Sequence, residues 1–352
     1  MQKQRESGFE LLRILCIAGI IFMHTFGGLN DSLTGLNRSI SIFINALFNT
    51  GVTCFILISG YFSIRFDLGK LIRLDLAVIF YTLLGTLLAG DLSAKALILS
   101  CIPILSRRYW FLSCYFALCF LSIFLNKFAE KASRKTLGGA ILLLLFLLSA
   151  IPTFAFFELT QDGGKGIAQM VMVYLIGRYI RMYHPEPFKK SRLFLLLSCS
   201  TLVIFALDFA LSLLKGVQMG TFCRDCSLFI LISSTLLLLL FRELHFKSRI
   251  INHLAGNVMP LYVAESFVRI YVLNRVFDLT SHTDSPLLLL YVAGYVLCTI
   301  VLCMAANEMR RLILEPVDSV IAGLLMKVYN RLQAPAVRLW ENSSAMLLRF
   351  LQ

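Results

Sequence analysis

Charged residues are scarce in this chain: they make up 15% of its 352 residues, whereas hydrophobic residues make up 58%. Because soluble globular domains carry about 25% charged residues, this composition excludes an ordinary soluble protein and predicts an all-α polytopic membrane protein. Long hydrophilic segments are also missing, which excludes a separate soluble domain and leaves any chemistry to the helix bundle and its faces. No convincing internal repeat is present, and this weakens the case for a transporter built from inverted halves.

Apolar runs are abundant instead, and we predict about ten transmembrane helices. Each is near the roughly 20 residues that a helix needs to cross the hydrocarbon core. The predicted spans are 9–28, 40–63, 71–90, 108–127, 136–157, 166–183, 193–214, 223–242, 256–277 and 286–306. We expect no cleavable signal peptide, because the first span is too long for a signal core and holds two ionisable residues.

Basic residues outnumber acidic ones, 33 to 20, and the formal net charge is +13. If the N-terminus is cytoplasmic, 23 of the Lys and Arg residues fall on the cytoplasmic side and 9 on the outer side. This asymmetry is typical of membrane topology, so we expect no nucleic-acid partner. It predicts cytoplasmic N- and C-termini and a multi-pass protein of a bacterial-type inner or plasma membrane, with the lipid bilayer as its surroundings.

Histidine is scarce as well, and of the five histidines only His24 falls inside a predicted span. Arg13 lies eleven residues earlier in the same span. At about 100° per residue the two side chains share one face of the helix, about 16 Å apart along its axis. Because ionisable groups are costly inside a membrane, both predict a functional site. The alternative is a satisfied interior histidine and a topology-setting arginine.

The depths at which Arg13 and His24 lie in the membrane predict the kind of substrate and reaction. Arg13 lies near the cytoplasmic boundary, with Glu10 as a candidate ion-pair partner three residues before it. His24 lies in the outer half of the hydrocarbon core. A helix face with an arginine near the cytoplasm and a histidine deeper in the membrane suits a long, phosphate-bearing donor. Such a donor would enter from the cytoplasm with its reactive end first. Imidazole can remove a proton from a hydroxyl near neutral pH, so His24 is the candidate base.

Further candidates lie at the cytoplasmic end of span 2 and just beyond it. Ser59 is small enough to permit close helix approach, and Tyr61 lies at the boundary. Arg65, Lys70 and Arg73 follow and suit the phosphates of a cofactor. The alternatives are a packing motif with an interfacial tyrosine, and ordinary positive-inside charge.

Span 4 begins with two arginines, Arg107 and Arg108, on the predicted outer side, against the topology rule. They either reach into outer headgroups or hold an acceptor near His24. Tyr109, Trp110 and Tyr115 follow, and an aromatic belt explains Tyr109 and Trp110 at least as well as sugar stacking does.

Two carboxylates, Asp208 and Glu265, fall inside predicted spans, and each is a candidate partner for a buried cation or imidazole. Cys223 and Cys226 form one CxxC at the outer end of span 8. A lone CxxC fits either two unpaired structural cysteines or an outer-face disulfide.

Residues 317–352 form a separate amphipathic tail in this prediction. Apolar residues at spacings of three and four predict a helix that ends at Pro335, followed by a second short apolar stretch. Both stretches are too short and too charged to span a membrane. We expect them in the cytoplasmic interface, anchoring or packing without a catalytic role.

Taken together, these features resemble the acyltransferase-3 family of integral membrane O-acyltransferases. The matching stretches are the Arg13–His24 pair, FILISGYF at 55–62, KLIRL at 70–74, RRYWFLSCYFALCFLSIFLNK at 107–127, VYLIGRYIR at 173–181 and PLYVAES at 260–266. They occur in the family's order and predict one transmembrane domain over residues 1–316.

The resemblance implies transfer of an acyl group, usually acetyl from acetyl-CoA, to a glycan hydroxyl. It implies that His24 is catalytic and that Arg13 handles the donor; no metal is expected. Many relatives have a histidine where this chain has Glu265, so the role of that histidine either falls to Glu265 or is absent. Our hypothesis assigns the donor to Arg13, Ser59, Tyr61, Arg65, Lys70 and Arg73, and the acceptor to Arg107, Arg108, Trp110, Tyr115 and Glu265.

Two rival hypotheses remain. A transporter or exporter of a lipid-linked glycan or polysaccharide would move its substrate without acetyl-CoA and would need a continuous polar path. A sensory or scaffold protein would leave the shared face of Arg13 and His24 unexplained.

Overall fold

The chain folds into a bundle of helices, and the computed structural model describes residues 6–184 and 186–351, with side chains up to residue 333. The elements are α1 (Ser7–Gly27), η1 (Asn30–Ser32), α2 (Gly35–Phe48), α3 (Thr50–Phe62), α4 (Leu68–Leu88), α5 (Ala94–Cys101), α6 (Trp110–Lys131), α7 (Arg134–Leu145), η2 (Phe146–Ala150), α8 (Ile151–Phe154), α9 (Ile167–Tyr183), α10 (Lys190–Lys215), α11 (Leu228–Arg242), α12 (Arg249–Leu254), η3 (Ala255–Asn257), α13 (Val258–Phe267), η4 (Val268–Val272), η5 (Leu273–Arg275), η6 (Leu279–His282) and α14 (Leu288–Leu351). These described residues contain no strand, so the all-α prediction is confirmed for them.

Seven helical segments within the described part of the chain are long and apolar enough to cross a membrane. They coincide with seven of the ten predicted spans, and α2 and α3 together make the second. The other three predicted spans, 166–183, 223–242 and 256–277, contain the shorter helices α9, α11 and α13. The structure therefore supports the predicted polytopic membrane protein. The number of ten transmembrane helices and the cytoplasmic position of both termini remain predictions.

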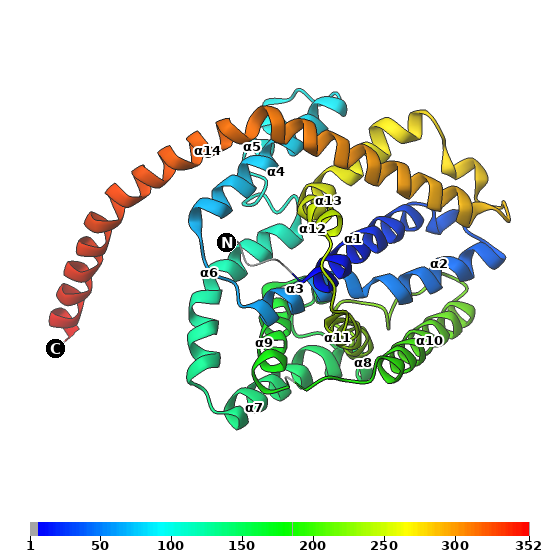
Figure 1. Cartoon of the computed structure of the whole chain (residues 1–352), viewed down its shortest axis with the longest axis horizontal. Helices are drawn as coiled ribbons and strands as arrows, with labels where there is room; N and C mark the ends of the chain where they lie inside the picture. The colour runs from blue at the N-terminus through cyan, green and yellow to red at the C-terminus, as the bar shows by residue number, and fades with distance from the viewer. Residues whose placement is uncertain (1–5, 185, 352) are drawn as a thin grey trace.

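Helix α1 lies near the middle of the bundle (Figure 1). It packs against α2, α3, α11, α13 and α14, and it has the largest buried share of the seven long segments. Because neighbours surround it, polar side chains on α1 face protein in most directions. The helix is regular from Ser7 to Gly27, so its residue spacing decides which side chains share a face.

Helices α3 and α9 cross at unusually short range because each contributes a glycine. A Cβ atom on Gly60 of α3 would lie 2.1 Å from the carbonyl oxygen of Tyr174 on α9. A Cβ atom on Gly177 of α9 would lie 2.4 Å from the carbonyl oxygen of Leu57 on α3. Small residues permit such close backbone approach inside membranes. The crossing fixes α3 and with it Ser59, which carries one wall of the site.

We expect Gly60→Ala to destabilise the protein by about 1–3 kcal/mol or more, because the added methyl group meets backbone atoms that have no room to move. Gly139→Ala is the matched control, since Gly139 lies in α7 and no atom lies within 4 Å of the place that its added methyl group would take. Thermal unfolding in detergent should show a lower midpoint for Gly60→Ala alone. Equal midpoints for the two variants would contradict the tight crossing.

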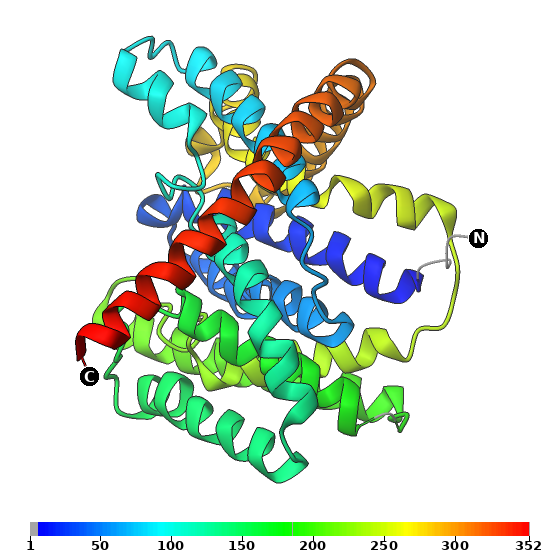
Figure 2. The same cartoon turned by 90° about the vertical axis from the view of Figure 1, so that its left-hand side faces the viewer.

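The last helix, α14, runs without interruption from Leu288 to Leu351. The predicted helix end at Pro335 is therefore wrong. A proline removes one backbone hydrogen bond and strains its preceding turn, but a helix continued on both sides can absorb that loss as a bend. Figure 1 shows α14, orange to red, curving away from the bundle toward its C-terminal end, which is nearest to the viewer in Figure 2. Residues 288–316 and 317–351 thus form one element rather than two.

The loop 217–227 folds against the end of α10, and Asp208 anchors it. The carboxylate accepts the backbone N–H groups of Phe222 and Cys223 at 2.8 and 3.0 Å. Asp208 therefore pairs with amides, not with a cation or an imidazole as proposed from the sequence. Cys223 and Cys226 are free thiols in this loop. Burial raises the pKa of both, that of Cys226 to about 11, so neither is a reactive thiolate at neutral pH.

Asp225 in the same loop is buried, and one of its oxygens has no hydrogen-bond partner among the described residues. Burial raises the pKa of its carboxyl to about 7, although Lys165 opposes the shift. A raised pKa means that the folded state prefers the protonated acid, so the stability it contributes is lost as the pH rises from about 4 through 7.

We expect Asp225→Asn to raise the midpoint of thermal unfolding at pH 8, because the amide stays neutral where the carboxylate must be buried charged. The gain should be about 2 °C or more and should shrink toward pH 4.5. Unfolding curves of both proteins at the two pH values measure it. A difference that does not change with pH would contradict burial of this carboxyl.

Candidate active site

One face of α1 carries four residues in register: Arg13, Ile17, Ile20 and His24. Their spacings of four, three and four residues place them along one stripe, as predicted for the two ends of the series. Arg13 lines one cavity, and Ile17 and Ile20 line the next. His24 follows one turn later toward the Gly27 end. Arg13, Ile17 and Ile20 therefore face internal cavities, and His24 continues the same stripe with a side chain that is 44% exposed.

His24 is paired with a carboxylate from α13. Its Nδ1 lies 2.8 Å from Oε1 of Glu265, and the Glu265 side chain is only 4% exposed. Since a carboxylate accepts hydrogen bonds, Nδ1 carries the proton and Nε2 is left with a lone pair. The His24 side chain is 44% exposed, so this nitrogen can meet a substrate. Such a base held by a buried acid is a common arrangement for proton removal.

Arg269 holds the other side of Glu265. Its Nε donates to Oε2 of Glu265 at 2.5 Å, and its guanidinium also reaches the backbone oxygen of His24 at 3.4 Å. The arginine lies in η4, a π-helical turn that continues α13, and such turns are frequent at functional sites. Sequence reasoning missed Arg269 as a site residue and counted it as an outer topology charge. The signal that could have found it is its i,i+4 spacing from an intramembrane carboxylate.

Arg13 opens onto a cavity of about 240 Å³ near the Ser7 end of α1, with both polar and apolar walls. Ser59 and Tyr115 line it with Arg13, and η3 and the start of α13 close another side. Glu10 forms the predicted local ion pair with Arg13, at 3.3 Å. Because 31% of the Arg13 side chain is exposed, its guanidinium remains accessible to an anion in the cavity.

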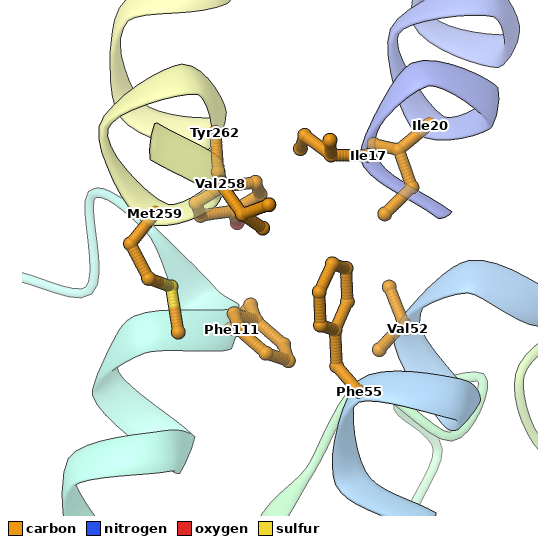
Figure 3. A pocket seen from close by; sticks show the side chains of 8 residues that line it. All are labelled: Ile17, Ile20, Val52, Phe55, Phe111, Val258, Met259 and Tyr262. Atoms are coloured by element: carbon orange, nitrogen blue, oxygen red, sulfur yellow. The ribbon is translucent and has the colours of Figure 1, made fainter. Parts of the chain in front are cut away.

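Next to this cavity, one helical turn before His24 on α1, lies a narrow apolar pocket, which we call the throat. Figure 3 shows its walls and the ring of Phe55 pointing into the middle of them. The throat is lined by Ile17 and Ile20 from α1, Val52 and Phe55 from α3, Phe111 from α6, and Val258, Met259 and Tyr262 from α13. Four of these residues, Phe55, Phe111, Val258 and Met259, also line the Arg13 cavity, so the two spaces adjoin.

Helices α1 and α13 thus present matching layers along the passage. The first layer pairs Arg13 with the η3 segment, and the throat forms the second. The third layer is His24 with Glu265. On α13, Glu265 follows Tyr262 by three residues and Val258 by seven, so all three share one face. An elongated molecule with a charged tail and a reactive head fits this order of layers.

The structure does not bring all the predicted donor residues to the cavity. Tyr61 is buried against Phe9 and accepts a hydrogen bond from Arg181, so it packs instead of lining the cavity. The three predicted basic residues lie on the segment after α3 and on the first turns of α4: Arg65, Lys70 and Arg73. None of the three lines the cavity, whereas Leu74, the residue after Arg73, does.

The predicted acceptor residues are likewise separated. Arg108 donates to Thr86 and Ser100 and lies over the ring of Phe267, and Arg107 is exposed. Trp110 is partly buried beside Phe111. The remaining two have different surroundings again, since Tyr115 lines the Arg13 cavity and Glu265 binds His24.

Comparison with known proteins identifies one family. A model of the acyltransferase-3 family, described as an acyltransferase domain, matches residues 6–308. That range covers most of the chain and includes every residue of the three layers. No curated protein matches the chain, and no solved structure does.

Proposed function

Because the chain belongs to the acyltransferase-3 family, we propose that it is a membrane-embedded O-acyltransferase. In this proposal it transfers an acetyl group from acetyl-CoA to a hydroxyl of a cell-surface glycan or of its precursor. It acts in a bacterial-type inner membrane, with the Ser7 end of α1 at the cytoplasmic face. The observation that carries the proposal is the hydrogen bond from His24 to Glu265, on the same face of α1 as Arg13 and its cavity.

The donor's phosphates bind where cations gather. Arg13 lines the cavity, and Arg73 directly precedes Leu74, another lining residue. Arginine and lysine are the usual partners of phosphate groups. The pantetheine arm then points through the throat, and the thioester arrives next to His24. This direction of the donor matches the order along α1, in which Arg13 comes first, the apolar residues of the throat follow, and His24 comes last.

The transfer itself needs one base and one leaving group. Nε2 of His24 removes the proton of the glycan hydroxyl while the hydroxyl oxygen attacks the thioester carbonyl carbon. The carbon–sulfur bond breaks, and the CoA sulfur leaves with the proton that His24 returns. Glu265 holds the ring in the required tautomer and stabilises the imidazolium formed during the step, while Arg269 keeps Glu265 in place.

A direct experiment uses the purified protein in lipid vesicles with acetyl-CoA whose acetyl group is isotopically labelled. Glycan mass spectrometry should show a gain of one labelled acetyl group per modified residue, and an equal amount of free CoA should appear. Vesicles without the protein are the control. Glycan that crosses the vesicle membrane without acetyl-CoA and without modification would support the exporter hypothesis instead.

A further inference from the structure

A second large cavity lies at the Gly27 end of α1, and we call it the outer cavity. Its volume is about 330 Å³, which is within the roughly 300–1,000 Å³ that is usual for small-molecule sites. It forms where the turn after α1, the first turn of α2 and the turn after α10 come together, and Figure 1 shows α2 between the other two helices. Four of its seven lining residues are polar or charged: Asn30, Asp31, Arg38 and Gln218.

The two amide side chains of this cavity are oriented by a short chain of hydrogen bonds. Nε2 of Gln218 donates to Oγ of Ser41 at 3.0 Å, and that hydroxyl donates to Oδ1 of Asn30 at 2.9 Å. Ser41 itself is fully buried. The Asn30 amide therefore keeps its N–H donors for another partner. Gln218 keeps Oε1, a buried acceptor that has no hydrogen-bond partner among the described residues.

Two charged side chains line the same cavity and have no partner. Arg38 is partly buried and Asp31 is exposed. Within the described part of the chain, neither forms an ion pair or a side-chain hydrogen bond. A ligand that bonds to both would supply charge-assisted hydrogen bonds that the protein itself does not make.

The walls of the outer cavity are anchored from behind. Asn37, next to Arg38, donates at 2.8 and 2.9 Å to two backbone carbonyls of the loop before α14. On the opposite wall, Oγ of Ser212 accepts the backbone N–H of Met219 at 2.8 Å. Gly216 has a φ of +71°, the left-handed conformation that favours glycine, and it ends α10 so that the chain can turn along the cavity. The site is therefore formed before a ligand binds, which reduces the cost of ordering it.

We propose that the outer cavity binds a sugar unit of the acceptor glycan. This inference rests on the proposed function and deepens it, because it assigns a site to the acceptor. A sugar hydroxyl both donates and accepts hydrogen bonds. Neighbouring hydroxyls of one ring thus match the donors of Asn30 and Arg38 together with the carboxylate of Asp31. Rotation of the Gln218 amide toward the cavity gives its unmet oxygen a hydroxyl partner, which removes the cost of a buried acceptor without a hydrogen bond.

A phospholipid headgroup fits these walls less well. Its phosphodiester accepts hydrogen bonds but has no proton to donate, so it leaves Gln218 unsatisfied. Asp31 repels it, since both groups are negative at neutral pH. One cation, one carboxylate and two amides in a single cavity are instead suited to hydroxyl groups.

The outer cavity lies at the same end of α1 as the candidate base. Asn30 follows His24 by six residues, and the backbone N–H groups of Gly28 and Leu29 fix the turn between them by donating to the carbonyls of His24 and Phe26. In the proposed topology this end faces outward. A glycan contains several sugars, so the unit held in the outer cavity need not be the unit that is acylated.

The test uses the intact protein in phosphatidylcholine nanodiscs and oligosaccharides released by mild acid from the surface polysaccharide of cells that carry the protein. Alkali first removes any ester groups from these oligosaccharides. Equilibrium dialysis measures their binding, and labelled acetyl-CoA measures transfer to them. Arg38→Ala and Asp31→Asn should each raise the oligosaccharide Kd and KM by at least about 10-fold, while the donor KM and the kcat at saturating acceptor stay unchanged.

Arg275→Ala is the matched control, because Arg275 is an exposed arginine that does not line the outer cavity. Its oligosaccharide Kd should equal that of the wild-type protein. Arg38 and Asp31 lack partners in the described structure, so their variants should unfold at the wild-type temperature. If Arg38→Ala does not fold, Asp31→Asn decides the same question.

The outcomes separate this inference from the proposed function. Oligosaccharide binding that Arg38→Ala weakens, without transfer by any preparation, would uphold the sugar site and overturn the proposed acyltransferase. Transfer by the wild-type protein with an unchanged oligosaccharide Kd in Arg38→Ala and Asp31→Asn would overturn the sugar site alone. Inorganic phosphate that binds the wild-type protein but not Arg38→Ala, where oligosaccharides bind neither, would show a headgroup site and overturn the inference as well.

Discussion

Replacing His24 with alanine is expected to lower acyl transfer by about 10²-fold to 10⁴-fold, because the hydroxyl would lose its base. The change removes the imidazole at the end of the passage and leaves the Arg13 cavity and the throat intact. Donor binding should therefore survive while transfer fails. Transfer of labelled acetyl groups and equilibrium binding of CoA to the same preparations measure these two properties separately.

His245→Ala is the control for this variant, because His245 lies in the loop after α11, away from the three layers. It should transfer acetyl groups at the rate of the unmodified protein. Full activity in His24→Ala would end the assignment of His24 as the base. Loss of CoA binding along with transfer would show instead that the substitution disturbs the fold.

Replacing Glu265 with glutamine is expected to reduce kcat by about 10²-fold with little effect on the donor KM. The amide has the size of the carboxylate but can donate a hydrogen bond to Nδ1, which would stabilise the tautomer that carries its proton on Nε2. The change also removes the negative charge that balances Arg269 and the imidazolium.

A second histidine–glutamate pair supplies a matched control. His253 and Glu308 lie 3.2 Å apart, and both side chains are substantially exposed, 60% and 38%. Glu308 also accepts a hydrogen bond from Asn257 of η3, but among the described residues it has none with His24 or Glu265. Glu308→Gln therefore alters a pair of the same composition away from the base, and kcat should not change. If Glu265→Gln behaves like Glu308→Gln, Glu265 does not position the base.

The stripe on α1 could be predicted because it depends only on the period of a regular helix. The same reasoning gave the Glu10–Arg13 ion pair, which the structure confirms at 3.3 Å. The small residues near the end of span 2 also predicted close packing, and Gly60 makes it. The stripe and the ion pair lie within a few turns of one helix, where geometry leaves few alternatives, whereas the helix that Gly60 approaches was not predicted.

The pairing of His24 with Glu265 could not be obtained in that way. The two residues are 241 positions apart, and only the packing of α1 against α13 joins them. The π-helical turn at η4, which places Arg269 against Glu265, has no sequence signature that we recognise. The helix end at Pro335 failed for a different reason, because a local rule for proline was applied to a helix that continues on both sides.

The narrowness of the throat has a consequence for the ion and proton gradients across the membrane. A wide, wet tunnel through a membrane would let ions and protons run down their gradients whenever the enzyme was idle. A constriction of apolar side chains with room for about one water molecule interrupts the file of hydrogen-bonded waters that such leakage requires. The protein in a planar bilayer should therefore show no measurable conductance, even under an applied voltage.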